Sequence, residues 1–416
     1  MLVNDRRSVQ GTLIVTNATV FDGENAELVD GPVAVRDGRI VAVGDTGDTG
    51  DRGDTGDLGD GAVVVDAEGG TVLPGLIDAH CHPYGISLDM VDIEASPLSY
   101  IAIVAAGRLR NAVRRGFTTI RDVAGGEAGL AKAIAEGRLE APRYLFTGPA
   151  LSQTGGHGDA RPAHWDTCPC HSHTTEVVDG VDPLRRAVRE RFRQGAHAIK
   201  IMTSGGVVSL TDPIRIPQYS EDEIRAVTAE AARRGSYVAA HSYSPEAIVH
   251  SVRNGVRSIE HGNLLDSASA AAMAEHGAFL IPTLAAYDAM DRRGVELGMA
   301  AVSLAKNREV LDAGRQAIEL AVAAGVPVGF GTDLMGELEE EQLNGLRLQS
   351  EVLGILDTLR CATSVNARLL GLEDLGVVRP GAIADLLVVS GNPLEQPECL
   401  WDPAAQRIVI QGGRVV

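Results

Sequence analysis

The middle of the chain, residues 74–365, alternates short apolar runs with longer segments whose apolar residues recur at helical spacing. Short apolar runs of this kind predict buried strands, and the longer periodic segments predict helices. The predicted strands are Val72–His80, Thr118–Val123, Arg143–Thr147, Ala198–Met202, Tyr237–Ala240, Ser258–Glu260, Ala278–Pro282 and Val326–Gly331. Eight strands that alternate with helices predict an α/β fold, a TIM-type (β/α)8 barrel.

Two of the predicted helices have clear start signals. Ser220 is followed three residues later by Glu223, which is the spacing of a capping box, and Gly235 marks the end of that helix. Ser244 precedes Pro245, and proline suits the first helical position. Both helices therefore follow predicted strands within the repeating pattern.

The two ends of the chain have a different pattern, which predicts short strands separated by turns. The Asp37-Gly38 pair predicts a tight hairpin turn between two N-terminal strands. Further short strands are predicted at Ala384–Val389 and Arg407–Gln411 near the C-terminus. We therefore expect residues 1–73 and 371–416 to build one small β-sandwich, with residues 74–370 as the barrel between them.

Residues 44–61 form a run of Gly-Asp triplets inside the N-terminal part. Known calcium-binding nonapeptides have another period, and a collagen helix needs proline, which this run lacks. The composition favours a flexible acidic loop that builds no core. Cation binding by its aspartates stays an open alternative.

The formal net charge is −19, which argues against a nucleic acid or an anionic membrane as partner. The odd count of five cysteines, spread over 416 residues, does not indicate a disulfide framework. Neither a signal peptide nor a membrane-spanning apolar stretch is recognisable. We expect a cytoplasmic protein that acts on a small-molecule substrate.

Polar side chains able to bind metal follow five of the predicted strands. They are His80 and His82 after the first, Lys200 on the fourth, His241 after the fifth, His261 after the sixth and Asp333 after the eighth. Strand alternation places His80 and His82 on one face, so that both imidazoles can bind one ion. Barrel enzymes carry their function at these strand ends, so the pattern predicts a metal centre.

Lys200 is unusual because it stands within an apolar strand in a chain with only three lysines. A buried ammonium is costly without a partner, and a desolvated lysine titrates readily. A neutral amine beside two metal ions can react with carbon dioxide to form a carbamate, which is a bridging carboxylate. The alternative is an ion pair with Asp122 or Asp333.

The sequence resembles the amidohydrolase superfamily, in particular its imidazolonepropionase-related and Xaa-Pro dipeptidase-like branch. The matching stretches are Val72–His82, Gly116–Asp122, Thr154–Asp159, the Lys200 strand, Ile259–Gly262, Gly331–Asp333 and Gly381–Leu386. The resemblance implies that His80, His82 and Asp333 hold one ion and that His241 and His261 hold the other. It also implies that Lys200 bridges the two ions as a carbamate.

This resemblance implies hydrolysis of an amide or peptide-like C–N bond, in a dipeptide or N-acyl amino acid, by a metal-bridging hydroxide. Asp333 would move the proton from the attacking water to the leaving amine. His157 resembles a substrate-contacting histidine, and Tyr243 and Arg161 are further candidates for binding a substrate carboxylate. Zinc suits this ligand set, and manganese or cobalt is also accepted.

Other hydrolases, a deaminase and a non-enzymatic scaffold are the alternatives to this function. The same metal pair can hydrolyse an ester, lactone, carbamate or organophosphate. A mononuclear deaminase of the superfamily usually has a glutamate where this chain has Ser244, so a deaminase is disfavoured. A non-enzymatic scaffold is disfavoured because all six ligands are present. Relatives are often multimers, so we expect a homo-oligomer.

The segment from Cys168 to His173 is dense in metal-binding residues, namely Cys168, Cys170, His171 and His173. The Cys-x-Cys spacing differs from the usual zinc spacing of two to four intervening residues. We therefore favour a lid loop over the barrel mouth. A third metal site is the alternative.

Overall fold

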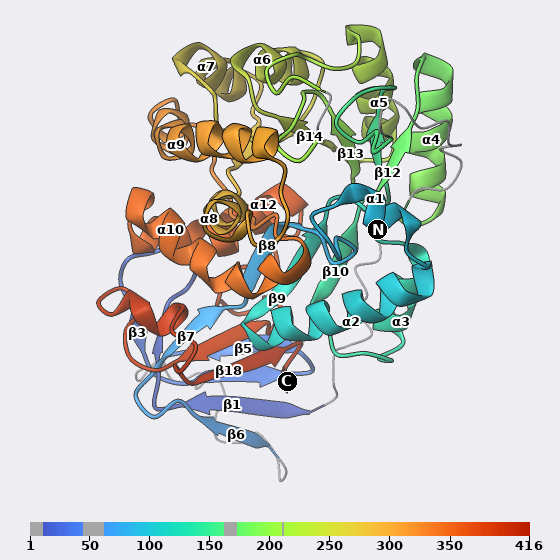
Figure 1. The fold of residues 1–416 in the computed structure, drawn as a ribbon. Helices are drawn as coiled ribbons and strands as arrows, with labels where there is room; N and C mark the ends of the chain where they lie inside the picture. Colours follow the sequence, from blue (N-terminus) through green and yellow to red (C-terminus); the bar gives the residue numbers. More distant parts are fainter. Residues whose placement is uncertain (1–10, 45–61, 162–172, 210–211) are drawn as a thin grey trace.

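The computed structural model describes residues 11–44, 62–161, 173–209 and 212–416. Strands from the beginning and the end of this chain lie together in the lower part of Figure 1, where blue and red elements adjoin. Strands and helices from the middle of the chain form the upper part. The Gly-Asp run at 45–61 and the Cys/His-rich segment at 162–172 lie outside the described residues.

Two sheets make up the lower part. The first has the order β5-β4-β1-β6, and the second has the order β19-β18-β17-β7-β2-β3. Their strands are β1 (Thr12–Thr16), β2 (Thr19–Val20), β3 (Val29–Asp30), β4 (Val33–Arg36), β5 (Arg39–Val43), β6 (Val63–Asp66), β7 (Thr71–Pro74), β17 (Leu386–Val389), β18 (Arg407–Gln411) and β19 (Arg414–Val415). The second sheet therefore combines strands from both ends of the chain.

A shared apolar core joins these two sheets. Val15 and Val33 contribute from the first sheet, and Leu386 and Ile410 contribute from the second. All four side chains are fully buried. The predicted Asp37-Gly38 turn connects β4 and β5, with φ angles of 49° and 77°. Positive φ at both positions is what a tight hairpin of this kind requires.

The middle of the chain forms two parallel sheets, ordered β10-β9-β8 and β12-β11-β13-β14-β15-β16. Their strands are β8 (Leu76–Cys81), β9 (Phe117–Asp122), β10 (Arg143–Phe146), β11 (Ala150–Ser152), β12 (Thr175–Val177), β13 (Ile199–Met202), β14 (Val238–Ser242), β15 (Ser258–His261) and β16 (Phe279–Ile281). Seven of the eight predicted strands of the middle segment correspond to one of these.

The eighth predicted strand, Val326–Gly331, is not a regular strand in the structure. Its backbone nevertheless bonds to strands on both sides. The Gly329 amide donates to the Leu280 carbonyl at 2.8 Å, and the Ala79 amide donates to the Phe330 carbonyl at 3.0 Å. The segment thus links β16 to β8, and places Asp333 beside the end of β8.

Helices separate most of these strands, as the spacing predicted. They are α1 (Met90–Ala95), α2 (Leu98–Arg114), α3 (Ala128–Ala135), α4 (Val181–Arg193), α5 (Glu221–Arg233), α6 (Pro245–Arg253), α7 (Ser267–Glu275), α8 (Leu284–Arg293), α9 (Ala301–Ala323), α10 (Asn344–Leu353), α11 (Ile355–Arg360) and α12 (Asn366–Leu370). Short 3-10 segments lie at Gly336–Leu343 and Pro397–Leu400, and a π turn at Cys361–Val365. The Ser220–Glu223 capping box and the Ser244 cap are both present.

One predicted strand is divided between two sheets. Val72–His80 was expected to be continuous, but β7 ends at Pro74 and β8 begins at Leu76. Gly75 lies at the crossing, where a Cβ atom would come within 2.2 Å of the Thr118 hydroxyl oxygen. The absence of a side chain therefore lets the chain pass closely from the terminal sheet into the parallel sheet.

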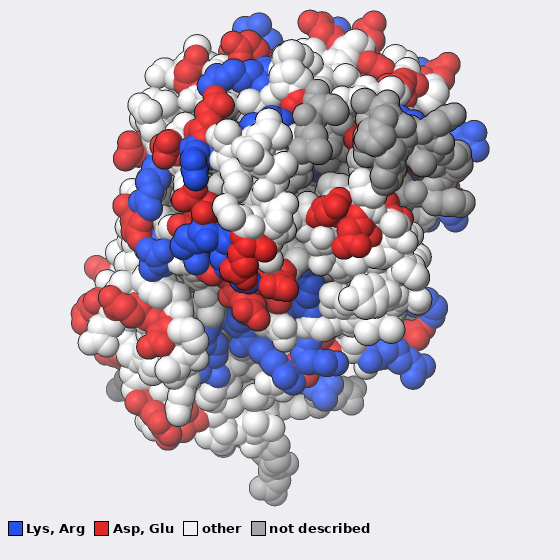
Figure 2. All heavy atoms as spheres, viewed as in Figure 1, with Lys and Arg blue, Asp and Glu red and all other residues white. Residues whose placement is uncertain are grey.

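Charged side chains of both signs intermingle on the face shown in Figure 2. Arg292, for example, pairs with both Asp288 and Glu341. Among the described residues, no helix has the length and apolar character needed to cross a membrane. The described cysteines, Cys81, Cys361 and Cys399, are free thiols.

A buried ion pair connects the parallel sheets to the terminal sheets. Arg143 on β10 donates from Nε and Nη2 to the two carboxylate oxygens of Asp385, at 2.6 and 3.0 Å. The two side chains are 6% and 2% exposed. Asp385 also accepts the backbone amide of Gly412, at the turn after β18. The pair therefore contributes to how the two parts of the fold are joined.

We predict that Asp385→Asn destabilises the protein, because the substitution leaves the Arg143 charge buried without its counterion. Breaking one partner of a buried pair costs about 3–5 kcal/mol. Chemical or thermal unfolding measures the change. Glu140→Gln is the control, since its pair with Arg114 is solvent-exposed and such pairs contribute at most about 1 kcal/mol. Equal effects of the two substitutions would contradict this assignment.

Candidate active site

The six predicted ligands come together in one cavity. His80, His82, Lys200, His241, His261 and Asp333 all line it, together with His157 and Tyr243. The cavity measures about 770 Å³, counted with its open mouth. Parallel strands end at the same edge of their sheet, which is why residues far apart in sequence meet here.

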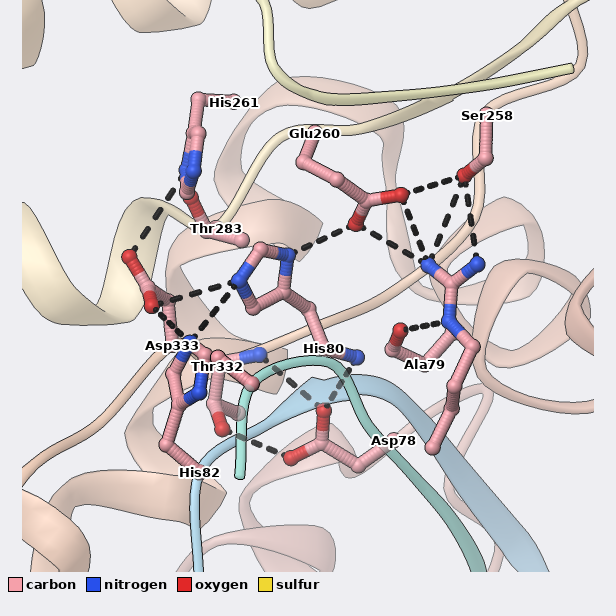
Figure 3. A network of polar contacts seen from close by, with 12 residues as sticks. Asp78, Ala79, His80, His82, Ser258, Glu260, His261, Thr283, Thr332 and Asp333 are labelled. Carbon is pink, nitrogen blue, oxygen red and sulfur yellow. Dashed lines mark hydrogen bonds and ion pairs between the residues drawn. The ribbon is translucent and has the colours of Figure 1, made fainter. Parts of the chain in front are cut away.

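His80, His82 and Asp333 form the tightest group. The two imidazole Nε2 atoms are 3.1 Å apart, and Asp333 Oδ1 lies 3.3 Å from the first and 2.8 Å from the second. Figure 3 shows these side chains pointing toward one another. Nitrogen and oxygen lone pairs that converge in this way fit a divalent metal ion. Suitable ligand atoms of all three residues lie within 4.8 Å of one another.

The electrostatics of this group favour the charge states that bind metal. Burial raises the pKa of Asp333, but the adjacent imidazoles of His80 and His82 outweigh this and hold that pKa well below its ordinary value. Burial lowers the pKa of His82. The group is therefore an ionised carboxylate beside neutral imidazole, which is the form that coordinates a metal.

His241 and His261 lie beside this group, and each has one ring nitrogen in contact with a neighbouring polar group. His241 Nε2 donates to the Gly205 carbonyl at 3.1 Å, so its Nδ1 carries the lone pair. His261 Nδ1 lies 2.9 Å from the Thr283 hydroxyl and 2.8 Å from the Tyr287 hydroxyl. Burial lowers the pKa of both imidazoles well below the ordinary value. These two histidines are therefore neutral as well.

Lys200 is almost fully buried at the same cavity, with 2% of its surface exposed. The expected alternative, an ion pair with Asp122 or Asp333, is not found: within the described residues no carboxylate lies close enough to pair with its amine. Asp122 instead accepts the Tyr144 hydroxyl at 2.7 Å. Burial lowers the pKa of Lys200 to about 8.

Two of the candidate ligands have a strained backbone. His261 and Asp333 have positive φ angles of 71° and 57°, a region that residues other than glycine rarely adopt. Thr283, whose hydroxyl contacts His261, has a φ of 48°. Strain of this kind persists where the surrounding structure requires it, and it concentrates at functional sites.

His157 and Tyr243, two residues expected to bind substrate, both line the cavity. The His157 ring stacks on His241 with centroids 4.1 Å apart, and its Nδ1 lies 2.8 Å from the Ser209 hydroxyl. The Tyr243 hydroxyl lies 2.7 Å from the Tyr287 hydroxyl. Apolar side chains form much of the remaining wall: Leu88, Met90, Ile93, Val207, Val208, Ala286, Met290, Met335 and Leu338.

Arg161, the third residue expected to bind substrate, is not among the described residues that line the cavity. Its guanidinium pairs with the nearby Asp159, with two contacts of 2.7 Å. A bidentate pair two residues away along the chain occupies the donors that a substrate carboxylate would need.

Several residues around the ligands were not predicted. Glu260 and Arg121 lie behind His80, Asp78 holds the backbone of His80 and Thr332, and Tyr287 contacts His261. The available signal was a charged residue within an apolar strand, as in Thr-Ile-Arg-Asp, Ile-Asp-Ala-His and Ile-Glu-His. The same signal marks Lys200, which was predicted, and it marks Arg121, Asp78 and Glu260 equally.

The predicted lid or third metal site falls mainly outside the described residues, with His173 as its described end. The His173 amide donates to the Glu94 carboxylate at 2.5 Å, and its Nε2 lies 3.1 Å from the Ser96 carbonyl oxygen. Thr174 contacts the same Glu94. Glu94 therefore anchors the end of this segment to α1, one of the elements that line the cavity.

Comparison with known proteins agrees with this geometry. Residues 71–416 match the model of the amidohydrolase family. The ochratoxinase of Aspergillus niger is 31% identical over 371 residues, spanning 83% of this chain and 75% of the relative. A prolidase complexed with N-methylphosphonate-L-proline superposes with a TM-score of 0.92 at 42% identity, covering 97% of this chain and 99% of the other. A Xaa-Pro dipeptidase with bound methionine superposes with a TM-score of 0.83 at 27% identity, covering 98% and 100%.

We predict that Arg161→Ala leaves the KM for a dipeptide substrate unchanged, because Arg161 pairs with Asp159 away from the cavity. Tyr243→Phe, the matched variant within the cavity, is expected to raise KM about tenfold through the loss of one buried hydrogen bond to substrate. Steady-state kinetics measures both. A large rise in KM for Arg161→Ala alone would show that the arginine reaches the substrate.

Proposed function

This chain belongs to the amidohydrolase family and is a hydrolase acting on carbon–nitrogen bonds, and from this premise we propose that it cleaves the amide bond of a dipeptide or an N-acyl amino acid. The observation that carries the proposal is the convergence of six ligand-type side chains on one cavity. The predicted membership of the superfamily, and of its branch with Xaa-Pro dipeptidases, is confirmed by the comparisons.

The proposal includes the architecture that positions the site. Seven strands of the two parallel sheets, together with segment 326–331 between β16 and β8, would form one eight-stranded barrel, residues 74–370; the seven are β8, β9, β10, β13, β14, β15 and β16. Residues 1–73 and 371–416 would then form a β-sandwich domain. The backbone bonds from Gly329 to Leu280 and from Ala79 to Phe330 support closure on that side, and a bond of 2.8 Å from the His197 amide to the Phe146 carbonyl supports it on the other.

Two divalent metal ions, of which zinc suits these ligands best, would be held at the strand ends. His80, His82 and Asp333 would hold one ion, and His241 and His261 would hold the other. Such a pair, when bound, polarises the scissile carbonyl and makes water a stronger nucleophile. The neutral imidazoles and the ionised Asp333 found at the cavity are the donor states such ions need.

Lys200 would bridge the two ions as a carbamate. The ammonium first loses one proton to give the neutral amine, and the amine nitrogen then adds to carbon dioxide with loss of a second proton, so that the buried cation becomes an anion. Its burial at the cavity and its lack of an ion-pair partner among the described residues support this assignment. A buried charge without a partner is unfavourable, and the carbamate removes that cost by supplying an acceptor where metal cations are proposed.

Asp333 would serve as the proton carrier of the reaction. Its carboxylate lies at the cavity with Oδ2 3.7 Å from His261 Nδ1, and it can accept the proton of the attacking water and deliver it to the leaving amine. His157 and Tyr243 would bind the carboxylate or carbonyl of the substrate. The apolar wall would take an uncharged aliphatic side chain.

Removal of metal tests the proposal directly. Dialysis against a chelator should abolish hydrolysis of a panel of dipeptides and N-acyl amino acids, and zinc, manganese or cobalt should restore it, because the ligands cannot polarise the substrate alone. Substrates with an apolar side chain in the acyl part should be preferred over charged ones. Esters and lactones serve as the comparison panel. Full activity of the metal-free protein would contradict the proposal.

Lys200→Ala should reduce metal affinity by more than about 100-fold, beyond what the loss of an outer-shell partner causes. The physical reason is the loss of the bridging group. Metal content after gel filtration and kcat are the measurements. Lys132→Ala is the matched control, because Lys132 is exposed and pairs only with Glu136 on the surface. A Lys200→Ala protein with normal metal content and activity would rule out the bridging role.

A further inference from the structure

Glu260 lies behind His80, on the side away from the cavity. It belongs to β15, its side chain is fully buried, and it does not line the cavity. Its Oε2 accepts a hydrogen bond of 2.6 Å from His80 Nδ1 (Figure 3). The carboxylate therefore contacts the opposite edge of the imidazole from the one that faces His82 and Asp333.

This contact determines which nitrogen of His80 carries the proton. A carboxylate only accepts, so Nδ1 bears the hydrogen and Nε2 carries the lone pair. That Nε2 is the atom lying 3.1 Å from His82 Nε2 and 3.3 Å from Asp333 Oδ1. A carboxylate partner of this kind fixes the ring orientation and makes the metal-facing nitrogen more basic.

Arg121 holds Glu260 in place. Its Nη2 donates to both carboxylate oxygens of Glu260, at 2.8 and 3.0 Å, and its Nε donates to the Ala79 carbonyl at 2.5 Å. Burial raises the pKa of Glu260, but the adjacent Arg121 guanidinium outweighs burial and keeps that pKa below its ordinary value. Glu260 is therefore a carboxylate in a fixed position, connected to β8 and β9.

We propose that Glu260, held by Arg121, is a positioning residue that orients His80 for metal binding. The inference rests on the proposed metal centre and adds to it a residue outside the six ligands. An ion pair whose only role is stability is the competing account, and buried ion pairs are weak evidence for stability. The two accounts differ in what happens to metal affinity when the charge of Glu260 is removed.

The test is a titration of the metal-free protein with cobalt(II), whose visible absorption reports the ligands around the ion. The wild-type protein should bind two ions per chain. Glu260→Gln should weaken one of the two by about 10- to 100-fold, the range for loss of an outer-shell partner, and leave the other unchanged. Its cobalt spectrum should change for the weakened ion only.

Asp385→Asn is the matched control. It breaks another buried arginine–carboxylate pair, Arg143 with Asp385, at the junction between the parallel and the terminal sheets. It should lower the melting temperature while both cobalt affinities stay as in the wild type. Loss of stability is thereby separated from loss of metal positioning.

Glu260→Gln leaves the Arg121 charge buried without its counterion, so the double variant Arg121→Met/Glu260→Gln is the second arm. Both charges are removed, so this protein should fold. A neutral amide makes His80 Nε2 less basic than a carboxylate does, so the variant should still show the weakened ion. If either variant folds and binds both ions with wild-type affinity, the positioning role of Glu260 is overturned, while the proposed metal centre is not. A wild-type protein that takes up no cobalt would overturn the metal centre itself.

Discussion

Imidazole nitrogens and a carboxylate converge at hydrogen-bonding distance inside a buried cavity, and the rest of the site is arranged around this convergence. These groups belong to His80, His82 and Asp333, with contacts of 2.8 to 3.3 Å between their ligand atoms. Lys200 adds a buried amine without an ion-pair partner among the described residues. The arrangement brings to one place the donor atoms that divalent metal ions bind, as expected of a metal-binding site.

The fold supports this arrangement by engaging one nitrogen of three of the histidine rings. Glu260 holds His80, the Gly205 carbonyl holds His241, and the hydroxyls of Thr283 and Tyr287 contact His261. Each contact comes from another strand or loop, so the assembled sheets determine the orientation of the ligands. The remaining wall of the cavity is mainly apolar, and His157 and Tyr243 are polar residues beside it.

Much of the fold and the ligand set could be predicted because both follow local rules. Strand alternation places His80 and His82 on one face, and strand ends of parallel sheets meet, so their clustering followed from sequence position. The single strand Val72–His80 was wrong because Gly75 permits a crossing that no local pattern reveals. The pairing of Arg161 with Asp159 could not be predicted, because it is a contact between side chains, which strand periodicity does not report. Glu260 and Arg121 were missed because their meeting depends on pairing between distant strands.

The central claim, that two metal ions lie among these side chains with Lys200 between them, is tested most directly by a crystal structure of the zinc-loaded protein with anomalous data collected at the zinc absorption edge. We expect two anomalous peaks in the cavity, one beside His80, His82 and Asp333 and one beside His241 and His261, with density for a carboxylate extending from the Lys200 amine. A single peak elsewhere, or no peak and an unmodified Lys200, would contradict the account.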